Sequence, residues 1–162
     1  PIPDIACMDH YCVTAPSSSA WPHPWGTRLE ETAHYTSDLK AAAEPRPIWV
    51  WTQGVANWTE RPARPVPTVE ELSAQLVLNL SRGAKGILWF VYDAALGKRY
   101  PDVREAMAGW GRVLALVRDD LLAAEPCPVP VEAPAGCDAR LLVGRDAAVL
   151  CLVNTEIGRA HV

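Results

Sequence analysis

The sequence predicts an α/β protein built on three parallel strands. Three short apolar runs, at residues 5–11, 48–53 and 87–93, each end in polar or aromatic side chains. A loop and then a helix-like stretch follow each run, and repeated strand–loop–helix units form parallel sheets. The strands start about forty residues apart, and in an α/β barrel the carboxyl ends of all such strands open on one face. We therefore expect the carboxyl ends of the three strands to meet on one face.

The first helix is predicted over residues 28–43, between a loop at 13–27 and Pro45. The second follows a loop at 54–67 and has a clear start signal. Thr68 and Glu71 form the pattern of a capping box, and Gly83 is suited to the left-handed turn that ends a helix. Residues 84–86 are then expected to be a tight connection into the third strand.

The strongest helical pattern covers residues 102–122, directly after Pro101. Its apolar side chains recur at helical spacing over five turns and predict a core-facing stripe: Val103, Met107, Trp110, Leu114, Val117 and Leu121. We expect this stripe to pack against the sheet rather than bind a ligand.

The pattern changes after the proline-rich stretch 126–130. Two strand-like segments within 138–153, joined by a turn at 145–146, predict an antiparallel hairpin. We therefore expect a barrel-like part over residues 1–125 and the start of a small β-sandwich-like domain over 126–155. Residues 156–162 resemble a translated sequencing adapter, and we expect them to be a non-native tail.

Composition narrows the classes of partner. The 162 residues carry a net charge of −4 and no basic patch with interleaved aromatics, so nucleic acid is not an expected partner. No apolar run is long enough to span a bilayer. Localisation stays open between cytoplasmic and exported.

The five cysteines form no CxxC pair and no metal-ligand cluster. We expect buried thiols at Cys7 and Cys151, whereas Cys127 and Cys137 could form a disulfide in an exported protein.

The alternative to a barrel is an open, doubly wound sheet. No glycine-rich phosphate-binding loop follows any of the strands, so a nucleotide cofactor is not expected, and the sequence implies no other cofactor and no metal. A full α/β barrel needs about 250 residues. This chain would therefore supply only the last three strand–helix units of a (β/α)8 barrel, with the remainder upstream.

Three segments resemble the late part of β-galactosidase-like glycoside hydrolase barrels. They are Arg46–Gln53, Pro67–Leu72 with Gln75, and the Gly-Ala-Lys-Gly turn that opens 83–93. The stretch from Asp4 to Tyr11 is similar to the sixth strand of such barrels, where an Asp precedes an aromatic residue. The resemblance covers residues 1–122 and implies a glycoside hydrolase or carbohydrate-binding barrel. It also departs from the family, since many members have a nucleophilic Glu where this chain has Gln53.

Glycoside hydrolysis uses two carboxyl groups on either side of the sugar bond. Asp9 ends an apolar strand and is the candidate acid/base or sugar-contact residue, the alternative being a capping or ion-pairing role. Asp93 has a similar position but also suits a turn. His10 is a candidate proton carrier or hydroxyl ligand, and Tyr11 a candidate sugar contact, with a structural hydrogen bond as the alternative role of His10.

The tryptophans supply the candidate sugar platform. Trp51 and Gln53 share one face of their strand, which we expect to point into the barrel mouth, where Gln53 could bind hydroxyls. Trp58 lies in a long loop, and Trp89 is expected to share a face with Asp93. Indole rings can stack on pyranose rings or serve as loop anchors.

The sequence therefore suggests a glycosidase, or a barrel that binds an oligosaccharide without hydrolysing it; a structural cell-surface barrel is the remaining alternative. The 162 residues alone are expected to be inactive, because three barrel strands leave open edges.

Overall fold

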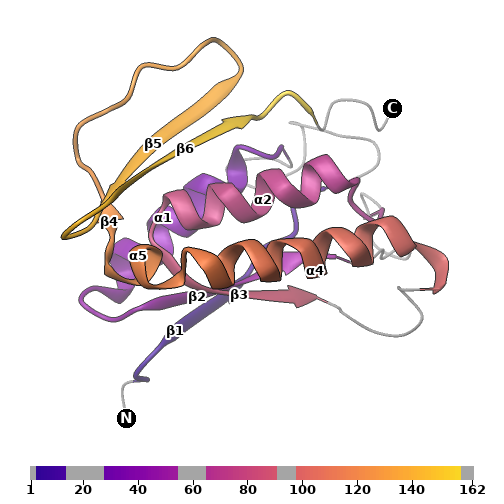
Figure 1. The fold of residues 1–162 in the computed structure, drawn as a ribbon, viewed down its shortest axis with the longest axis horizontal. Helices are drawn as coiled ribbons and strands as arrows, with labels where there is room; N and C mark the ends of the chain where they lie inside the picture. The colour runs from indigo at the N-terminus through magenta and orange to yellow at the C-terminus, as the bar shows by residue number, and fades with distance from the viewer. Residues whose placement is uncertain (1–2, 14–27, 55–64, 91–97, 158–162) are drawn as a thin grey trace.

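The computed structural model describes residues 3–13, 28–54, 65–90 and 98–157. Strands β1 (Ala6–Asp9), β2 (Ile48–Gln53) and β3 (Ala84–Phe90) pair in parallel in the order β1-β2-β3. The predicted parallel sheet is therefore confirmed, and its carboxyl ends lie at one edge (Figure 1).

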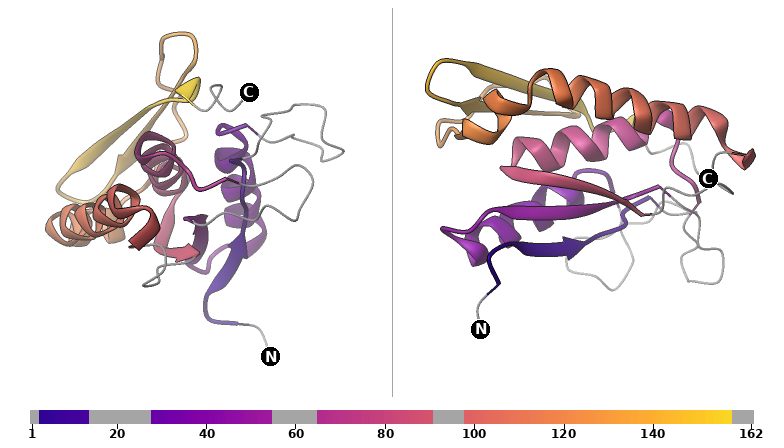
Figure 2. Two further views of the ribbon diagram at one scale, coloured as in Figure 1. Left: turned by 90° about the vertical axis from the view of Figure 1, so that its right-hand side faces the viewer. Right: turned by 60° about the horizontal axis from the view of Figure 1, so that its bottom comes forward.

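The helices that follow these strands lie on one face of the sheet (Figures 1 and 2). They are α1 (Glu31–Ala43), α2 (Val69–Ser81) and α4 (Pro101–Leu116), with the short α5 (Arg118–Ala123) after them. Ala43 of α1 packs with Ile48 and Val50 of β2, and Leu72 of α2 packs with Val103 and Met107 of α4.

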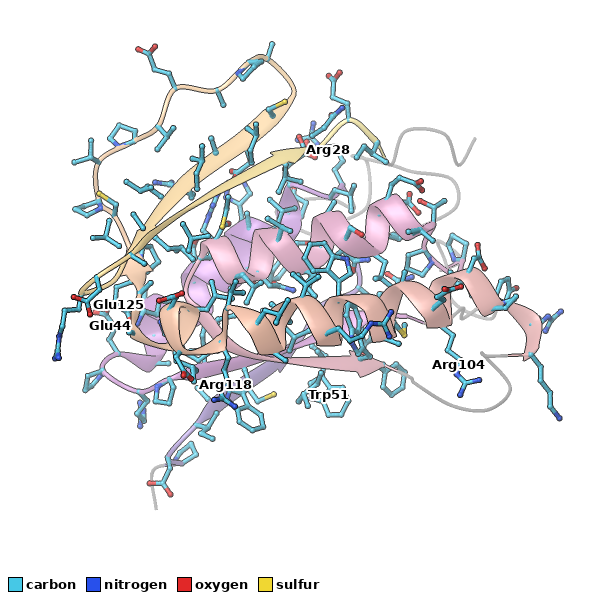
Figure 3. The ribbon with its side chains drawn as sticks, viewed as in Figure 1. Arg28, Glu44, Trp51, Arg104, Arg118 and Glu125 are labelled. Carbon is cyan, nitrogen blue, oxygen red and sulfur yellow. The ribbon has the colours of Figure 1, made fainter. Side chains whose placement is uncertain are left out.

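Strand β2 shows why the helices stay on one side. Ile48, Val50 and Thr52 are buried, as their β-branched side chains predict, whereas Trp49 and Trp51 are 39% and 36% exposed. Successive strand residues point to opposite faces, so the two tryptophans lie on the face without helices. Figure 3 shows Trp51 on the side of the sheet away from α2 and α4.

No described residue packs over this second face, termed the open face. Ile5, Cys7 and Phe90 are exposed there with the two tryptophans. The prediction of a buried Cys7 is wrong because nothing in the described part of the chain packs over β1 on that side. The Trp49 ring covers Gly86 of β3 so closely that a Cβ at position 86 would lie 2.6 Å from the indole.

The capping prediction for α2 is confirmed. The Thr68 hydroxyl accepts from the Glu71 amide at 3.2 Å, and the Glu71 carboxylate accepts from the Thr68 amide at 2.9 Å. Gly83 has φ +88° at the end of the helix, which only glycine adopts at low cost.

The boundaries of β3 and of the long helix differ most from the predictions. Residues 84–86 belong to β3 rather than to a connecting turn, because their backbone pairs with β2 from Ala84 onward. The predicted helix over 102–122 is divided at Val117 into α4 and α5. Its stripe is buried at Val103 and Met107, but Val117 is 36% exposed, so the core contact weakens toward the carboxyl end.

A second, antiparallel sheet follows, made of β4 (Glu125–Pro126), β5 (Cys137–Val143) and β6 (Ala148–Asn154). The predicted hairpin is confirmed, with Val143 opposite Ala148 around the turn. Strand β4 was not predicted, since two residues within a proline-rich stretch carry no strand pattern. Cys127 and Cys137 are free thiols in this structure, and Cys151 is buried as predicted.

The antiparallel sheet packs on the outer side of α2, which therefore lies between the two sheets (Figure 2). Val153 of β6 packs with Ala74 and Leu78 of α2, and Leu142 and Cys151 pack against Val77. The Arg82 guanidinium at the end of α2 also donates to both carboxylate oxygens of Asp138 in β5. The molecule thus has three layers: parallel sheet, helices and antiparallel sheet.

Candidate functional site

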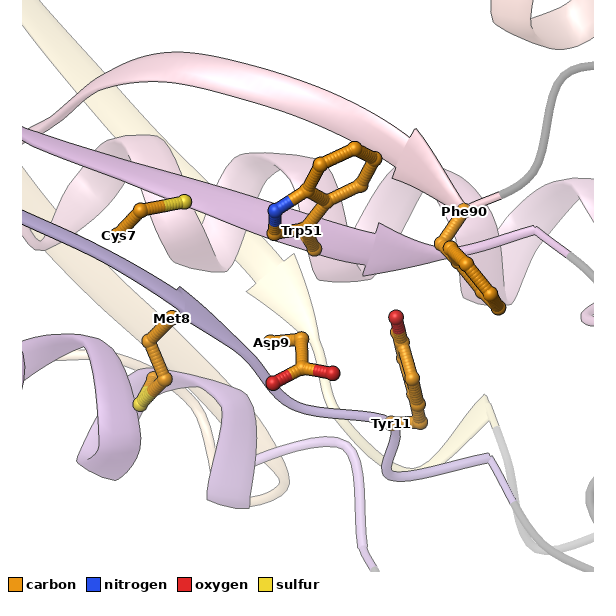
Figure 4. A pocket seen from close by; sticks show the side chains of 6 residues that line it. All are labelled: Cys7, Met8, Asp9, Tyr11, Trp51 and Phe90. Atoms are coloured by element: carbon orange, nitrogen blue, oxygen red, sulfur yellow. The ribbon is translucent and has the colours of Figure 1, made fainter.

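A hollow of about 370 Å³ opens on the open face near the carboxyl ends of the parallel strands. Six residues from all three strands and the segment after β1 line it (Figure 4): Cys7, Met8, Asp9, Tyr11, Trp51 and Phe90. Strand ends of this kind are where parallel α/β proteins bind ligands.

The register of the sheet explains how these residues come together. Asp9 of β1 is opposite Trp51 of β2, and the last residue of β2 is opposite Phe90 of β3. Cys7 and Asp9 alternate with residues that face the helices, so they share the open face with Trp51. Three residues separated by about forty positions in the sequence are therefore neighbours.

Aromatic rings form one wall of the hollow. The Tyr11 and Phe90 rings stack with centroids 5.5 Å apart and an interplanar angle of 24°. The Trp51 indole meets the edge of Phe90 at 6.2 Å and 81°. Such contacts fix ring orientation, so the hollow has an ordered apolar surface.

Asp9 is the acidic residue among the side chains that line the hollow. Figure 4 shows its carboxylate beside the Tyr11 ring and below the Trp51 indole. Asp9 is exposed and takes part in no ion pair or hydrogen bond with the described residues. An exposed carboxylate keeps its hydration and can accept hydrogen bonds from a ligand.

Gln53 does not point into this hollow, contrary to the expected orientation. Its side chain is 1% exposed, and its amide nitrogen donates to the carbonyl oxygens of Val13 at 3.0 Å and Pro65 at 2.9 Å. Its amide oxygen accepts from the Val13 amide at 3.0 Å. The alternation of side chains along β2 did not predict this position. The Gln53 amide is held instead by hydrogen bonds to the backbone of the adjoining segments.

His10 and Trp89 also lie away from the hollow. The His10 ring stacks on Tyr35 of α1 with centroids 3.7 Å apart, on the helix side of β1. Trp89 packs with the cluster of Leu72, Val103 and Met107, because its register places it opposite the inward-facing Thr52. Trp58 and Asp93 are outside the described residues.

Three lining residues were not predicted: Cys7, Met8 and Phe90. Alternation along β1 could have indicated Cys7, which has the parity of Asp9. Phe90 could have been found only with the β3 boundary and register, because both faces of its sequence run are apolar.

Buried polar groups lie between the parallel sheet and the helices α1 and α2. The Cys12 thiol is 3.0 Å from the Thr32 hydroxyl, and burial raises the pKa of Cys12 to about 12. Asn79 of α2 donates to Thr52 of β2 at 3.1 Å and accepts from Thr36 of α1 at 2.6 Å. These bonds join α1, α2 and β2 without exposing a reactive group.

The described part of the chain contains no group of three or more His, Cys, Asp or Glu side chains arranged to hold a metal ion. None of its helices combines the length and the apolar character that crossing a membrane requires. Comparison of the chain with protein-family models, curated proteins and solved structures finds no match.

Proposed function

We propose that the parallel sheet is a sector of a (β/α)8 barrel closed by further polypeptide. Two observations support this. The helices α1 and α2 that connect β1, β2 and β3 lie on the same face as α4, which follows the edge strand β3, as in successive strand–helix units of a barrel. Parallel sheets are normally covered on both faces, and the open face here carries large apolar side chains. In a closed barrel this face would line the interior.

We further propose that the hollow is part of a carbohydrate site. The observation that carries this proposal is the carboxylate of Asp9 next to the ordered rings of Tyr11, Phe90 and Trp51 at the carboxyl ends of the strands. Sugar rings present C–H faces that stack on aromatic surfaces and hydroxyls that donate to carboxylates. The resemblance to β-galactosidase-like barrels agrees with this chemistry.

In a hydrolase of this kind, Asp9 would act as an acid/base or hydroxyl-binding group. A second carboxyl group about 5–9.5 Å away is needed for hydrolysis. Asp93, outside the described residues, and the polypeptide that closes the barrel are its candidate sources.

A non-catalytic carbohydrate-binding barrel is the second candidate. It is favoured by the position of Gln53: this side chain is an amide and is turned away from the hollow. The two candidates share the binding site and differ in turnover.

Binding is tested by titrating the 162-residue chain with lactose while following ¹H–¹⁵N NMR spectra. We expect saturable, millimolar-range shifts of the Tyr11 and Phe90 amides and of the Trp51 indole N–H. Trp51→Ala and Asp9→Asn should each weaken binding by about tenfold, the effect of losing roughly 1.4 kcal/mol.

Trp49→Ala is the matched control, because Trp49 has nearly the same exposure on the same strand face but does not line the hollow. Equal weakening by the Trp49 and Trp51 variants, or shifts confined to other elements, would contradict the proposed site. Release of nitrophenol from nitrophenyl β-galactoside by a protein that includes the upstream strands would favour the hydrolase; saturable binding without release would favour the binding barrel.

A further inference from the structure

Gln53 is the last residue of β2 and contacts two segments that border the site. One is the segment directly after β1, which carries Tyr11 and reaches Val13. The other is the segment before α2, which begins in the described part at Pro65. The side chain is almost fully buried between them.

The contact with Val13 is reciprocal. The Val13 N–H donates to Oε1 of Gln53, and Nε2 of Gln53 donates to the Val13 carbonyl, both at 3.0 Å. A primary amide can make this pair because it has a donor and an acceptor side by side, as a strand backbone does. The paired register of β1 and β2 ends at Asp9 and Trp51, so the Gln53 side chain continues their connection after β1 has left the sheet.

The second N–H of the same amide donates to the Pro65 carbonyl at 2.9 Å. Both donors of Gln53 are therefore used, and each satisfies a backbone oxygen of a different segment. Pro65 lies three residues before Thr68, which caps α2, so the contact also fixes how the chain enters that helix.

We propose that Gln53 is a positioning residue that holds Tyr11 against Phe90 and thereby shapes the hollow. Val13 is two residues after Tyr11 and is 4% exposed, so fixing its backbone restricts where the Tyr11 ring can lie. This inference rests on the proposed function for its ligand, but its structural part concerns the unliganded chain. A carboxylate at position 53 would offer no donor to the two carbonyl oxygens, so a neutral amide is required.

The test compares Gln53→Met and Gln53→Glu with Gln75→Met. Gln75 of α2 is a matched control because it is equally buried, at 1% exposed, and its Nε2 has no hydrogen-bond partner among the described residues. At a concentration where the chain is monomeric, the Tyr11–Phe90 ring NOEs and the Trp51 indole shift are recorded well below the unfolding midpoint. Lactose affinity is measured on the same samples.

We expect both Gln53 variants to lose the Tyr11–Phe90 NOEs and to bind lactose about tenfold more weakly, whereas Gln75→Met keeps the NOEs and binds within about twofold of the parent. A Gln53 variant that lowers only the unfolding midpoint, with the NOEs and affinity of the parent, would overturn the proposal. Weaker lactose binding by a Gln53 variant that keeps the Tyr11–Phe90 NOEs would also contradict the proposal. It would show a structural role for Gln53 that does not act through the position of the Tyr11 ring.

Hydrogen exchange in the unaltered chain gives a second readout that does not depend on whether the variants fold. The Val13 amide and the Gln53 side-chain amide should exchange slowly; fast exchange at both would overturn the proposal. If the parent chain binds no lactose but the Gln53 variants still lose the ring NOEs, the carbohydrate proposal fails while the positioning role stands.

Discussion

Residues that lie close together in the sequence differ widely in their exposure in this molecule. Cys7 is exposed on the open face, whereas Cys12, five residues later, is 1% exposed beside Thr32. Trp51 and Gln53 have the same strand parity, but only Trp51 reaches the hollow. The exposure of each side chain depends on its hydrogen-bond partners and on which segments pack over it. The local sequence pattern predicts neither.

Burial of Cys12 predicts an alkaline loss of stability. Its pKa is about 12 in the folded chain and near 9 when unfolded, so between these values the unfolded chain loses a proton that the folded chain keeps. The free energy of unfolding should therefore fall as the pH rises above 9, by about 1.4 kcal/mol per pH unit from this group.

Urea unfolding at several pH values from about 8 to 10.5 checks this, with Cys12→Ala as the reference. The difference between the two curves isolates Cys12, because Cys151, whose pKa burial also raises, remains in both proteins. Parallel curves across this range would contradict the prediction. Below pH 9 the two proteins should differ by a constant amount.

Among the secondary-structure elements, β2 is buried on one face only. One face packs into the helices and the other meets solvent at Trp49 and Trp51. Helix α2 is the opposite case, because it packs against the parallel sheet on one side and the antiparallel sheet on the other. Its apolar residues are correspondingly distributed over a wide arc.

This asymmetry of β2 predicts unequal costs for two adjacent truncations. Ile48→Ala should lower the free energy of unfolding by about 2–5 kcal/mol, since Ile48 is fully buried and leaves a cavity. Trp49→Ala should cost only about 1 kcal/mol despite removing a larger side chain, because the indole is partly solvated. Denaturant unfolding of the two variants measures this; comparable losses would mean that another layer covers the open face.

In the whole molecule, no described residue packs over one face of the parallel sheet. The outer strands β1 and β3 of that sheet each have one edge without a strand partner among the described residues. Apolar residues also lie on the outer face of the antiparallel sheet, where Leu150 and Leu152 are 58% and 57% exposed. Surfaces of this kind are normally covered in stable proteins.

We therefore expect the 162-residue chain to self-associate at concentrations approaching about 1 mM. Sedimentation velocity should show species larger than a monomer. Trp49→Lys with Trp51→Lys should shift the distribution toward monomer, because two charges on the open face oppose its burial. Leu116→Lys is the control, since Leu116 is 86% exposed on α4 and away from that face. A monomeric parent chain, or an equal effect of the control, would contradict this prediction.

Local sequence patterns were enough to predict the three strands of the parallel sheet, the capping box at Thr68 and Glu71, the inward face of β2 and the hairpin of β5 and β6. These features depend on nearby residues, because side-chain alternation, capping hydrogen bonds and turn geometry are local.

Which strand-end residues meet depends on how the strands pair in the folded chain. The tertiary structure brought Asp9, Tyr11, Trp51 and Phe90 to one hollow through the register of β1, β2 and β3. It also turned Gln53 toward Val13 and Pro65 and left Cys7 exposed. Register, burial and the choice of hydrogen-bond partner depend on contacts between segments some forty residues apart, and no local pattern specifies them.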